Sequence, residues 1–232
     1  MKKQVAVIGL GRFGASLVQT LHGAGHEVLA IDKDEGKVQR IAASAAHAVQ
    51  ADATNESVLT ELGLKDFEVA VVAMGSDIES SVLCTILLRK IGVTYIIARA
   101  DHDLHGKILE RIGANRVVYP EHEMGISVAH TVMLREVDDY MSLDPDYGIS
   151  KLNSPKYLVG CTLEQLGFGP RGKSGVAILL LKRGEEIIVA PAMSEKVQVG
   201  DVLIPYGRDD QLEAMLNEAR KNYPAENAEK QA

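Results

Sequence analysis

Hydrophobic and polar positions follow a regular alternation over the first half of the chain. Short apolar runs are each followed by a longer segment with apolar residues at helical spacing, which predicts buried strands alternating with amphipathic helices. A glycine follows four of the predicted helices, as favoured at left-handed C-caps. Strands are expected at 5–8, 27–31, 47–50, 69–74, 94–99 and 116–119, and helices at 13–24, 35–44, 56–62, 78–91 and 104–112.

This alternation predicts the fold class. Strands that alternate with helices form parallel sheets covered on both faces. The run VAVVAM at 69–74 is apolar throughout, as is typical of a strand buried on both sides. We therefore expect an α/β protein with a Rossmann-like, doubly wound parallel sheet, followed by a second, smaller α+β domain.

The pattern changes after residue 119. Residues 124–141 read as one long helix, and 143–154, rich in Pro, Gly, Asn and Ser, read as a linker. Short strand-like runs follow at 156–159, 175–182, 187–190 and 201–206, with a hairpin turn at 182–185. The predicted organisation is a nucleotide-binding domain with a crossover helix at 1–141, a small domain at 142–217 and a disordered polar tail at 218–232.

Composition narrows the function classes. The formal net charge is −7, which argues against nucleic acid as the main partner, because such domains are usually basic. The cysteines, Cys84 and Cys161, lie far apart and fit a reducing compartment without a zinc site. No apolar run approaches the ~20 residues of a membrane helix, and the first strand begins too early to leave room for a signal peptide. A soluble, cytoplasmic protein is expected.

The first strand leads into a glycine-rich loop with the spacing G-x-G-x-x-G. Gly9 would permit the tight turn, Gly11 would let the backbone approach a phosphate, and Gly14 would let the helix pack on the sheet. The helix N-terminus then supplies free N–H donors. Asp32 ends the second strand, where a carboxylate accepts ribose hydroxyls and disfavours a 2′-phosphate. The alternative is a glycine turn without a ligand and a solvated Asp32.

Other strand ends supply further candidates, because ligands of open α/β sheets bind beyond the carboxyl ends of the strands. For several of these residues the alternative is a helix cap, since Asp, Ser and Thr commonly cap helices. For Asp77 the cap is the favoured interpretation. The candidate binding residues outside the glycine loop are Asp32, Lys33, Asp52, Ala53, Thr54, Met74, Gly75, Ser76 and Arg99.

Catalytic signatures are missing from the sequence. No G-x-S-x-G, H-E-x-x-H or Walker lysine motif is present. His102 and His105 are better interpreted as a surface pair than as metal ligands, because a third ligand is lacking. A binding protein without catalytic activity is therefore favoured, and an NAD-dependent oxidoreductase or NAD(H) redox sensor is the alternative. Glu121 and Glu123 either attract Mg²⁺ or Ca²⁺ or simply favour the first turn of a helix.

Several segments together resemble one known family. VAVIGLGRFG, VLAIDKD, AVQADAT, VAVVAMGSD and IGANRVVYPEHEMG occur in this order in the regulatory subunits of Ktr/Trk-type potassium uptake systems. The later segment KRGEEIIVAPAMSEKVQVGDVLIPYG is similar to their small C-terminal domain. These proteins carry the RCK domain (regulator of K⁺ conductance), with an N-terminal TrkA-N and a C-terminal TrkA-C part. The resemblance covers about residues 3 to 215.

The resemblance implies a function and an assembly. Family members are cytoplasmic dimers that assemble into an octameric ring beneath a membrane-embedded K⁺ channel subunit at the inner face of the plasma membrane. ATP and ADP bind the N-terminal domain and favour different ring shapes, with ATP activating, and NAD(H) is linked to Trk relatives. The protein is thus expected to be a non-enzymatic, nucleotide-sensing channel regulator.

The resemblance also implies roles for single residues. The family's phosphate-loop arginine corresponds to Arg12, which reaches terminal phosphates in a neighbouring subunit, and Phe13 follows it in the loop. Glu121 matches a glutamate that helps to hold a divalent cation between two nucleotide sites. Some relatives bind cyclic di-AMP in the C-terminal domain; Arg171 and Pro191 fall near their ligand contacts, whereas the surrounding GFGPRGKSG departs from them.

Overall fold

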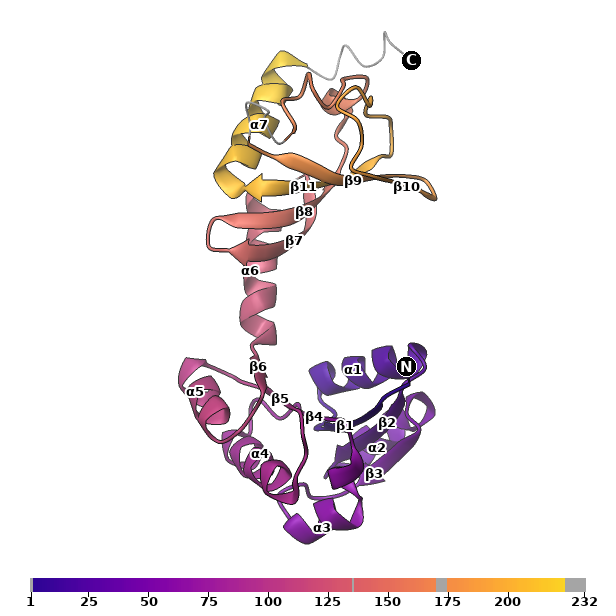
Figure 1. Ribbon diagram of the computed structural model, residues 1–232, viewed down its shortest axis with the longest axis vertical. Helices are drawn as coiled ribbons and strands as arrows, with labels where there is room; N and C mark the ends of the chain where they lie inside the picture. Colours follow the sequence, from indigo (N-terminus) through magenta and orange to yellow (C-terminus); the bar gives the residue numbers. More distant parts are fainter. Residues whose placement is uncertain (1, 135, 170–174, 224–232) are drawn as a thin grey trace. The chain divides into compact units, whose positions relative to one another are not determined.

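The computed structural model describes residues 2–134, 136–169 and 175–223 (Figure 1). Contacts divide the chain into two compact units, residues 1–121 and residues 122–232. Each unit has its own sheet and its own buried apolar clusters. Within the described ranges, none of the helices combines the length and the apolar character that a membrane crossing requires.

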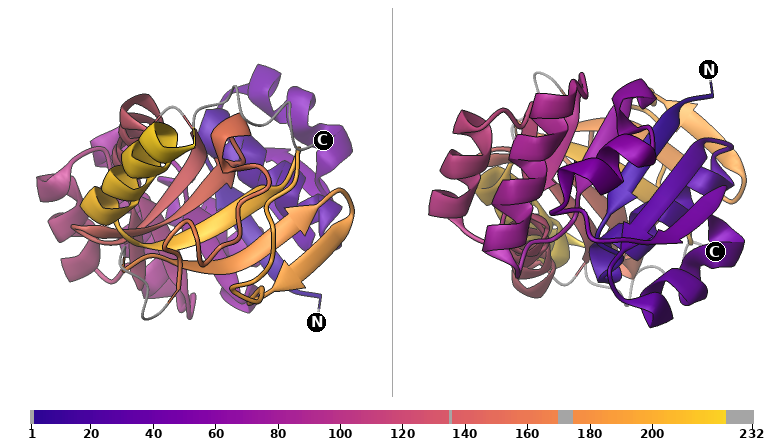
Figure 2. Two further views of the ribbon diagram at one scale, coloured as in Figure 1. Left: turned by 90° about the horizontal axis from the view of Figure 1, so that it is seen from above. Right: turned by 90° about the horizontal axis from the view of Figure 1, so that it is seen from below.

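The first unit is the expected doubly wound parallel sheet. Its six strands lie in the order β3-β2-β1-β4-β5-β6, and all neighbouring pairs are parallel. Helices flank the sheet on both faces (Figure 2, right). The strands are β1 (Gln4–Ile8), β2 (Glu27–Asp32), β3 (His47–Gln50), β4 (Val69–Val72), β5 (Ile96–Arg99) and β6 (Arg116–Val118), and the helices are α1 (Arg12–Gly23), α2 (Glu35–Ile41), α3 (Glu56–Glu61), α4 (Ile78–Ile91) and α5 (Asp103–Arg111).

The period-2 alternation of strand side chains builds two cores, one on each face of this sheet. Along β1, Ala6 and Ile8 pack into one buried cluster, whereas Val5 and Val7 pack into the other. The glycines expected after the helices have left-handed backbone, with φ of 84° at Gly25, 68° at Gly63, 97° at Gly92 and 114° at Gly113.

The order of the strands reverses at β1, which has β2 on one side and β4 on the other. Ile8, the last residue of β1, pairs in register with Ile31 of β2 and with Val72 of β4. The carboxyl ends of these strands therefore lie level with one another, at the position where open α/β sheets bind ligands.

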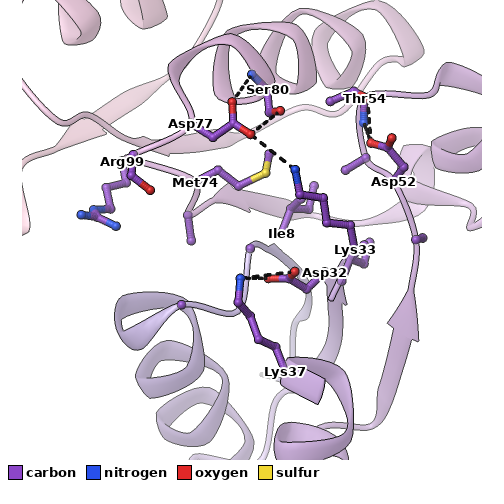
Figure 3. Close-up of a pocket in the computed structure, with 18 residues that line it drawn as sticks. Ile8, Asp32, Lys33, Lys37, Asp52, Thr54, Met74, Asp77, Ser80 and Arg99 are labelled. Atoms are coloured by element: carbon purple, nitrogen blue, oxygen red, sulfur yellow. Dashed lines mark hydrogen bonds and ion pairs between the residues drawn. The ribbon is translucent and has the colours of Figure 1, made fainter. Parts of the chain in front are cut away.

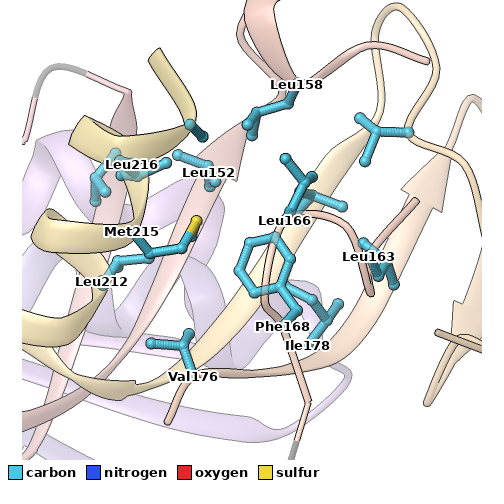
Figure 4. Packing of buried hydrophobic residues seen from close by; sticks show 14 of the residues in the cluster. Leu152, Leu158, Leu163, Leu166, Phe168, Val176, Ile178, Leu212, Met215 and Leu216 are labelled. Carbon is cyan, nitrogen blue, oxygen red and sulfur yellow. The ribbon is translucent and has the colours of Figure 1, made fainter. Parts of the chain in front are cut away.

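The second unit contains all but the first two residues of α6 (Pro120–Met133) and a five-stranded antiparallel sheet in the order β10-β9-β11-β8-β7. Helix α7 packs on this sheet (Figure 2, left). A leucine-rich core with Phe168 and Met215 lies between them (Figure 4). The remaining elements are β7 (Val137–Asp144), β8 (Tyr147–Asn153), β9 (Ala177–Arg183), β10 (Glu186–Val189), β11 (Val202–Arg208) and α7 (Asp209–Asn222).

The structure corrects the interpretation of residues 134–154. The expected long helix ends at Met133, and Val137–Asp144 is instead strand β7 of the second sheet. The expected linker is the hairpin β7–β8, whose turn contains Pro145 and Asp146. A boundary after Met141 therefore falls within β7, whose pairing with β8 places it in the second unit.

Two smaller predictions for this unit were also wrong. The strand expected at 156–159 is a 3₁₀ helix, Lys156–Leu158. The tail expected to be disordered from residue 218 is helical up to Asn222, because Leu212, Met215, Leu216 and Ala219 form one buried stripe of α7. The rest of the predicted tail, 224–232, lies outside the described residues. The predicted hairpin turn around Gly184 is present, with φ of 58° at that glycine.

Candidate functional site

A pocket lies at the carboxyl ends of the strands around the point where the strand order reverses (Figure 3). Most of the predicted binding residues line it together, although they come from widely separated parts of the chain. Those in the lining are Gly9, Gly11, Asp32, Lys33, Asp52, Ala53, Thr54, Met74, Gly75, Ser76 and Arg99. The pocket therefore combines a glycine loop, buried aliphatic walls and charged side chains of both signs.

The backbone of the glycine loop explains its glycines. Gly9 has φ of 95° and donates its N–H to Ile31 O at 2.8 Å, which ties the loop to β2. A Cβ on Gly14 would lie 1.9 Å from the Gly9 carbonyl oxygen, so α1 could not pack this closely with any other residue there. A Cβ on Gly11 would meet no protein atom within 4 Å. The space beside Gly11 is thus open, and Gly11 itself lines the pocket.

The N-terminus of α1 fits the phosphates of a nucleotide. Gly11 is its N-cap and offers no side chain to satisfy the first amide groups of the helix. These amides and the helix dipole would favour an anion next to the pocket. A nucleotide held here would have its phosphates against the Gly9–Gly11 segment and its ribose toward Asp32.

Asp32 is buried and fixed by several donors. Its Oδ2 accepts from Leu10 N–H at 2.7 Å, its Oδ1 accepts from Asp34 N–H at 2.9 Å, and Lys37 Nζ lies 3.2 Å from Oδ2. Burial raises the pKa of the Asp32 carboxyl, but these two backbone amides and Lys37 outweigh it and leave the pKa below its ordinary value. Asp32 is therefore an anionic acceptor beside the pocket.

The two loops after β3 and β4 use their acidic residues partly for local structure. Asp52 Oδ1 accepts from the amide and hydroxyl of Thr54 at 2.9 and 2.7 Å, and Asn55 rather than either residue caps α3. Asp77 caps α4 by accepting from Ser80 N–H at 3.1 Å, as favoured from the sequence. Asp77 also lines the pocket, where its Oδ2 lies 3.6 Å from Lys33 Nζ.

Arg99 lies at the end of β5 with its guanidinium against Gly75. A Cβ on Gly75 would come within 2.8 Å of Arg99 Cζ, so this glycine gives the guanidinium its room. Arg99 Nη2 donates to Glu121 Oε1 at 2.6 Å, whereas Arg99 Nε is buried without a hydrogen-bond partner. A buried unsatisfied donor in a pocket wall is suited to an anionic ligand.

Four predicted site residues do not line the pocket. Arg12 is the exposed first residue of α1, Phe13 beside it is half-buried, and Gly14 is buried under the Gly9 carbonyl. Glu121 is exposed and paired with Arg99. The described residues contain no cluster of three or more His, Cys, Asp or Glu able to hold a metal. Within one chain, therefore, the residues around Glu121 do not fit a divalent cation.

Pocket residues that the sequence analysis missed are Lys37, Asp77 and Ser80, besides the apolar walls formed by Ile8, Ile31, Ala51 and Ala73. Lys37 lies about one helical turn after Asp34, the N-cap of α2. This position places the Lys37 side chain against Asp32 at the end of β2. The only feature of the sequence that could have indicated this role of Lys37 is its position shortly after Asp32, the acidic residue that ends β2.

The interpretation of His102 and His105 as a surface pair was wrong for His105, which is buried. His105 Nδ1 accepts from Asp101 N–H at 3.2 Å, and His102 Nδ1 caps α5 by accepting from His105 N–H at 3.3 Å. Burial lowers the pKa of His105, which keeps the ring neutral. In the second unit, Pro191 is buried, and Arg171 lies outside the described residues.

Comparison with known proteins gives a consistent picture. The family model described as the TrkA-N domain matches residues 5–120. The Ktr system potassium uptake protein C of Bacillus subtilis is 42% identical over 207 residues, which cover 89% of this chain and 93% of the relative. The Ktr system potassium uptake protein A of the same organism is 39% identical, covering 93% of this chain and 96% of the relative.

Two solved structures are similar in fold across most of this chain. The GsuK RCK domain has a TM-score of 0.63 at 17% identity and covers 93% of this chain and 47% of its own. The GsuK channel bound to NAD has a TM-score of 0.62 at 17% identity, with coverage of 93% and 39%. This chain thus has an RCK-like fold and spans less than half of either GsuK chain. With the TrkA-N match and the extent of its identity to both Ktr proteins, the chain belongs to the TrkA-N family of Ktr-type potassium uptake proteins.

Proposed function

We propose that this protein is a nucleotide-sensing regulatory subunit of a membrane K⁺ uptake channel. The observation that carries the proposal is the pocket formed by the Gly9–Gly11 segment, Asp32 and Arg99, in a chain 42% identical to a Ktr potassium uptake protein over nearly its full length. The pocket has donors for phosphates at one end and an anionic acceptor for ribose hydroxyls at the other.

The preferred ligands in this proposal are ATP and ADP. Backbone amides at the start of α1 hold the phosphates that both nucleotides share. Asp32 accepts from the ribose, and Ala53, Thr54 and Met74 line the wall on the base side. Because ATP and ADP differ only at the terminal phosphate, the residues that distinguish them must lie at the phosphate end.

Arg12 is the residue that we assign to this discrimination. It is exposed at the start of α1 and lies outside the lining of its own pocket. In a dimer it can therefore meet the terminal phosphate held by the neighbouring copy. A nucleotide then shifts the conformation of the assembly by its difference in affinity for the two states.

The assembly in this proposal is a dimer that forms an octameric ring against the cytoplasmic face of a K⁺ channel subunit. A divalent cation beside Glu121 would need further oxygen ligands from a second copy or from nucleotide phosphates, because Arg99 already pairs with this carboxylate. We assign no step to such a cation. Cyclic di-AMP binding by the second unit has no support from the described residues.

NAD(H) sensing is the second candidate. It is favoured by the similar fold of the GsuK channel bound to NAD. Asp32 serves the ribose of either nucleotide, so the pocket itself does not choose between them. An oxidoreductase would in addition need a proton donor beside the nicotinamide, and no histidine lines the pocket among the described residues.

The test combines binding with channel function. ATP, ADP, NAD and NADH are titrated into the purified protein by calorimetry, and K⁺ flux is measured in liposomes that contain the channel subunit with and without this protein. The proposal expects micromolar binding of adenine nucleotides and a K⁺ flux that is higher with ATP than with ADP. Nucleotide binding without any effect on K⁺ flux would contradict the regulatory role, and binding of NAD or NADH much tighter than that of ATP and ADP would favour NAD(H) sensing.

A further inference from the structure

Lys37 occupies the position at which a bound ribose would meet Asp32. Its Nζ lies 3.2 Å from Asp32 Oδ2 and 3.5 Å from Oδ1, and its side chain lines the pocket (Figure 3). The Asp32 side chain is only 5% exposed, whereas that of Lys37 is 36% exposed. The carboxylate is therefore buried, and the ammonium belongs to the more exposed partner of the pair.

The hydrogen bonds of Asp32 show which part of the carboxylate remains free. Each oxygen already accepts one backbone N–H, from Leu10 at Oδ2 and from Asp34 at Oδ1. A carboxylate has about four acceptor positions, so about two remain. An ammonium within reach of both oxygens covers these two remaining positions. They are also the positions that the two hydroxyls of a ribose would use.

Binding of an unmodified ribose therefore requires Lys37 to share or leave Asp32. A ribose that carries a 2′-phosphate has the opposite requirement, since its dianion would be repelled by Asp32 and attracted by an ammonium beside it. From the acidic strand end alone, a 2′-phosphate is disfavoured. The ion pair changes this expectation, because Lys37 neutralises the carboxylate that would cause the repulsion.

We propose that Lys37 sets the selectivity of the pocket between a ribose hydroxyl and a ribose 2′-phosphate. With Lys37 present, the pocket admits 2′-phosphorylated adenine nucleotides with an affinity close to that of the unphosphorylated ones. Without it, Asp32 excludes them. This inference rests on the proposed binding of adenine nucleotides, and it names a ligand class that Asp32 by itself would reject.

Two pairs of probes isolate the effect, because each pair differs only in the 2′-phosphate. AMP is compared with adenosine 2′,5′-bisphosphate, and NAD with NADP, by calorimetry on the full chain. The variants are Lys37→Met, Lys37→Arg and, as matched control, Lys90→Met. Lys90 also pairs with a carboxylate, that of Glu56, but does not line the pocket. Thermal unfolding confirms that each variant is folded.

In the wild type, each 2′-phosphorylated probe is expected to bind within about tenfold of its partner. Lys37→Met is expected to weaken the 2′-phosphorylated member of each pair at least tenfold more than the other member. Lys37→Arg and Lys90→Met are expected to leave the ratio within about threefold of wild type. An unchanged ratio in a folded Lys37→Met protein that still binds AMP or NAD overturns the role of Lys37 and leaves the proposed function intact. Failure of the wild type to bind any adenine nucleotide overturns both.

Discussion

At the scale of single residues, different glycines of the glycine loop serve packing and binding. Gly14 is needed by the protein itself, because a Cβ there would lie 1.9 Å from the Gly9 carbonyl oxygen. Gly11 is not needed in this way, since a Cβ there would meet no protein atom within 4 Å, and its φ of −65° is open to any residue. The same substitution at the two positions should therefore have different consequences.

Gly14→Ala is expected to lower the free energy of unfolding by about 2 kcal/mol or more, because backbone atoms must move apart to admit the methyl group. Gly11→Ala is expected to change it by less than about 1 kcal/mol. It should nevertheless weaken nucleotide binding by at least about tenfold, because the methyl group enters the space beside the phosphates. Urea unfolding and calorimetric titration measure the two effects.

The opposite pattern would contradict this division of roles. If Gly11→Ala destabilises the fold as much as Gly14→Ala, then the loop conformation rather than ligand approach requires Gly11. If Gly14→Ala unfolds at the wild-type urea concentration, the close approach of α1 to Gly9 is not a constraint on stability.

The residue scale also shows what the sequence could predict of the site. The strand ends placed Asp32, Asp52 and Arg99 in one crevice, because topology alone brings parallel carboxyl ends together. Lys37 was missed because its role depends on the direction in which a helical side chain returns to the preceding strand end. Likewise, His105 could not be recognised as buried, because the α5 face that packs inward carries a polar residue.

At the scale of elements, the predicted strands and helices were correct where the spacing of apolar residues clearly matched one type of element. The parallel strands of the first unit centre on apolar residues and were each expected close to their observed positions. The prediction was wrong at 134–144. The register of β7 shifts between Val137 and Asp139, so that the buried residues Val137 and Tyr140 lie three apart, as they would in a helix. Because of this bulge, the buried residues of a strand have the spacing that is typical of a helix.

A polar cluster joins the elements of the second unit around this strand. Tyr140 of β7 stacks on His130 of α6, with ring centroids 3.6 Å apart and an angle of 4° between the planes. Both residues meet Asp209 at the N-terminus of α7, Tyr140 through its hydroxyl at 2.9 Å from both carboxylate oxygens and His130 through Nε2 at 3.1 Å. Burial, followed by the neighbouring Asp209, raises the pKa of Tyr140, so that the hydroxyl stays protonated and donates.

Tyr140→Phe is therefore expected to lower the free energy of unfolding by about 1 to 2 kcal/mol, because it removes a donor from a carboxylate while keeping the stacked ring. Tyr206→Phe, at a more exposed tyrosine of β11, is the control and should change it by less than about 0.5 kcal/mol. Equilibrium urea unfolding followed by circular dichroism measures both. Equal stability of the two variants would show that the hydrogen bond from Tyr140 to Asp209 does not contribute to the stability of this unit.

At the scale of the whole molecule, the main question is how an exposed arginine takes part in nucleotide sensing. A sequence can predict the pocket, because the pocket is made by one chain. It cannot predict the neighbour of Arg12, because nothing in a single chain's periodicity specifies what meets an exposed helix start. The family resemblance supplied that part of the hypothesis, and one chain leaves Arg12 outside its own pocket.

If Arg12 meets the terminal phosphate held by a neighbouring copy, Arg12→Ala removes an interaction that ATP makes and ADP lacks. We expect the affinity for ATP to fall at least about tenfold and the affinity for ADP to change less than about threefold, as for loss of one charge-assisted hydrogen bond. Arg40→Ala is the matched control. Arg40 is also exposed and lies three residues after the pocket residue Lys37, but it does not line the pocket. Calorimetry with both nucleotides, on protein whose oligomeric state is checked by light scattering, measures the difference. Equal losses for ATP and ADP would mean that Arg12 acts on the shared phosphates or on assembly, and the discrimination would then be expected from the cationic residues of the pocket lining, Lys33, Lys37 and Arg99.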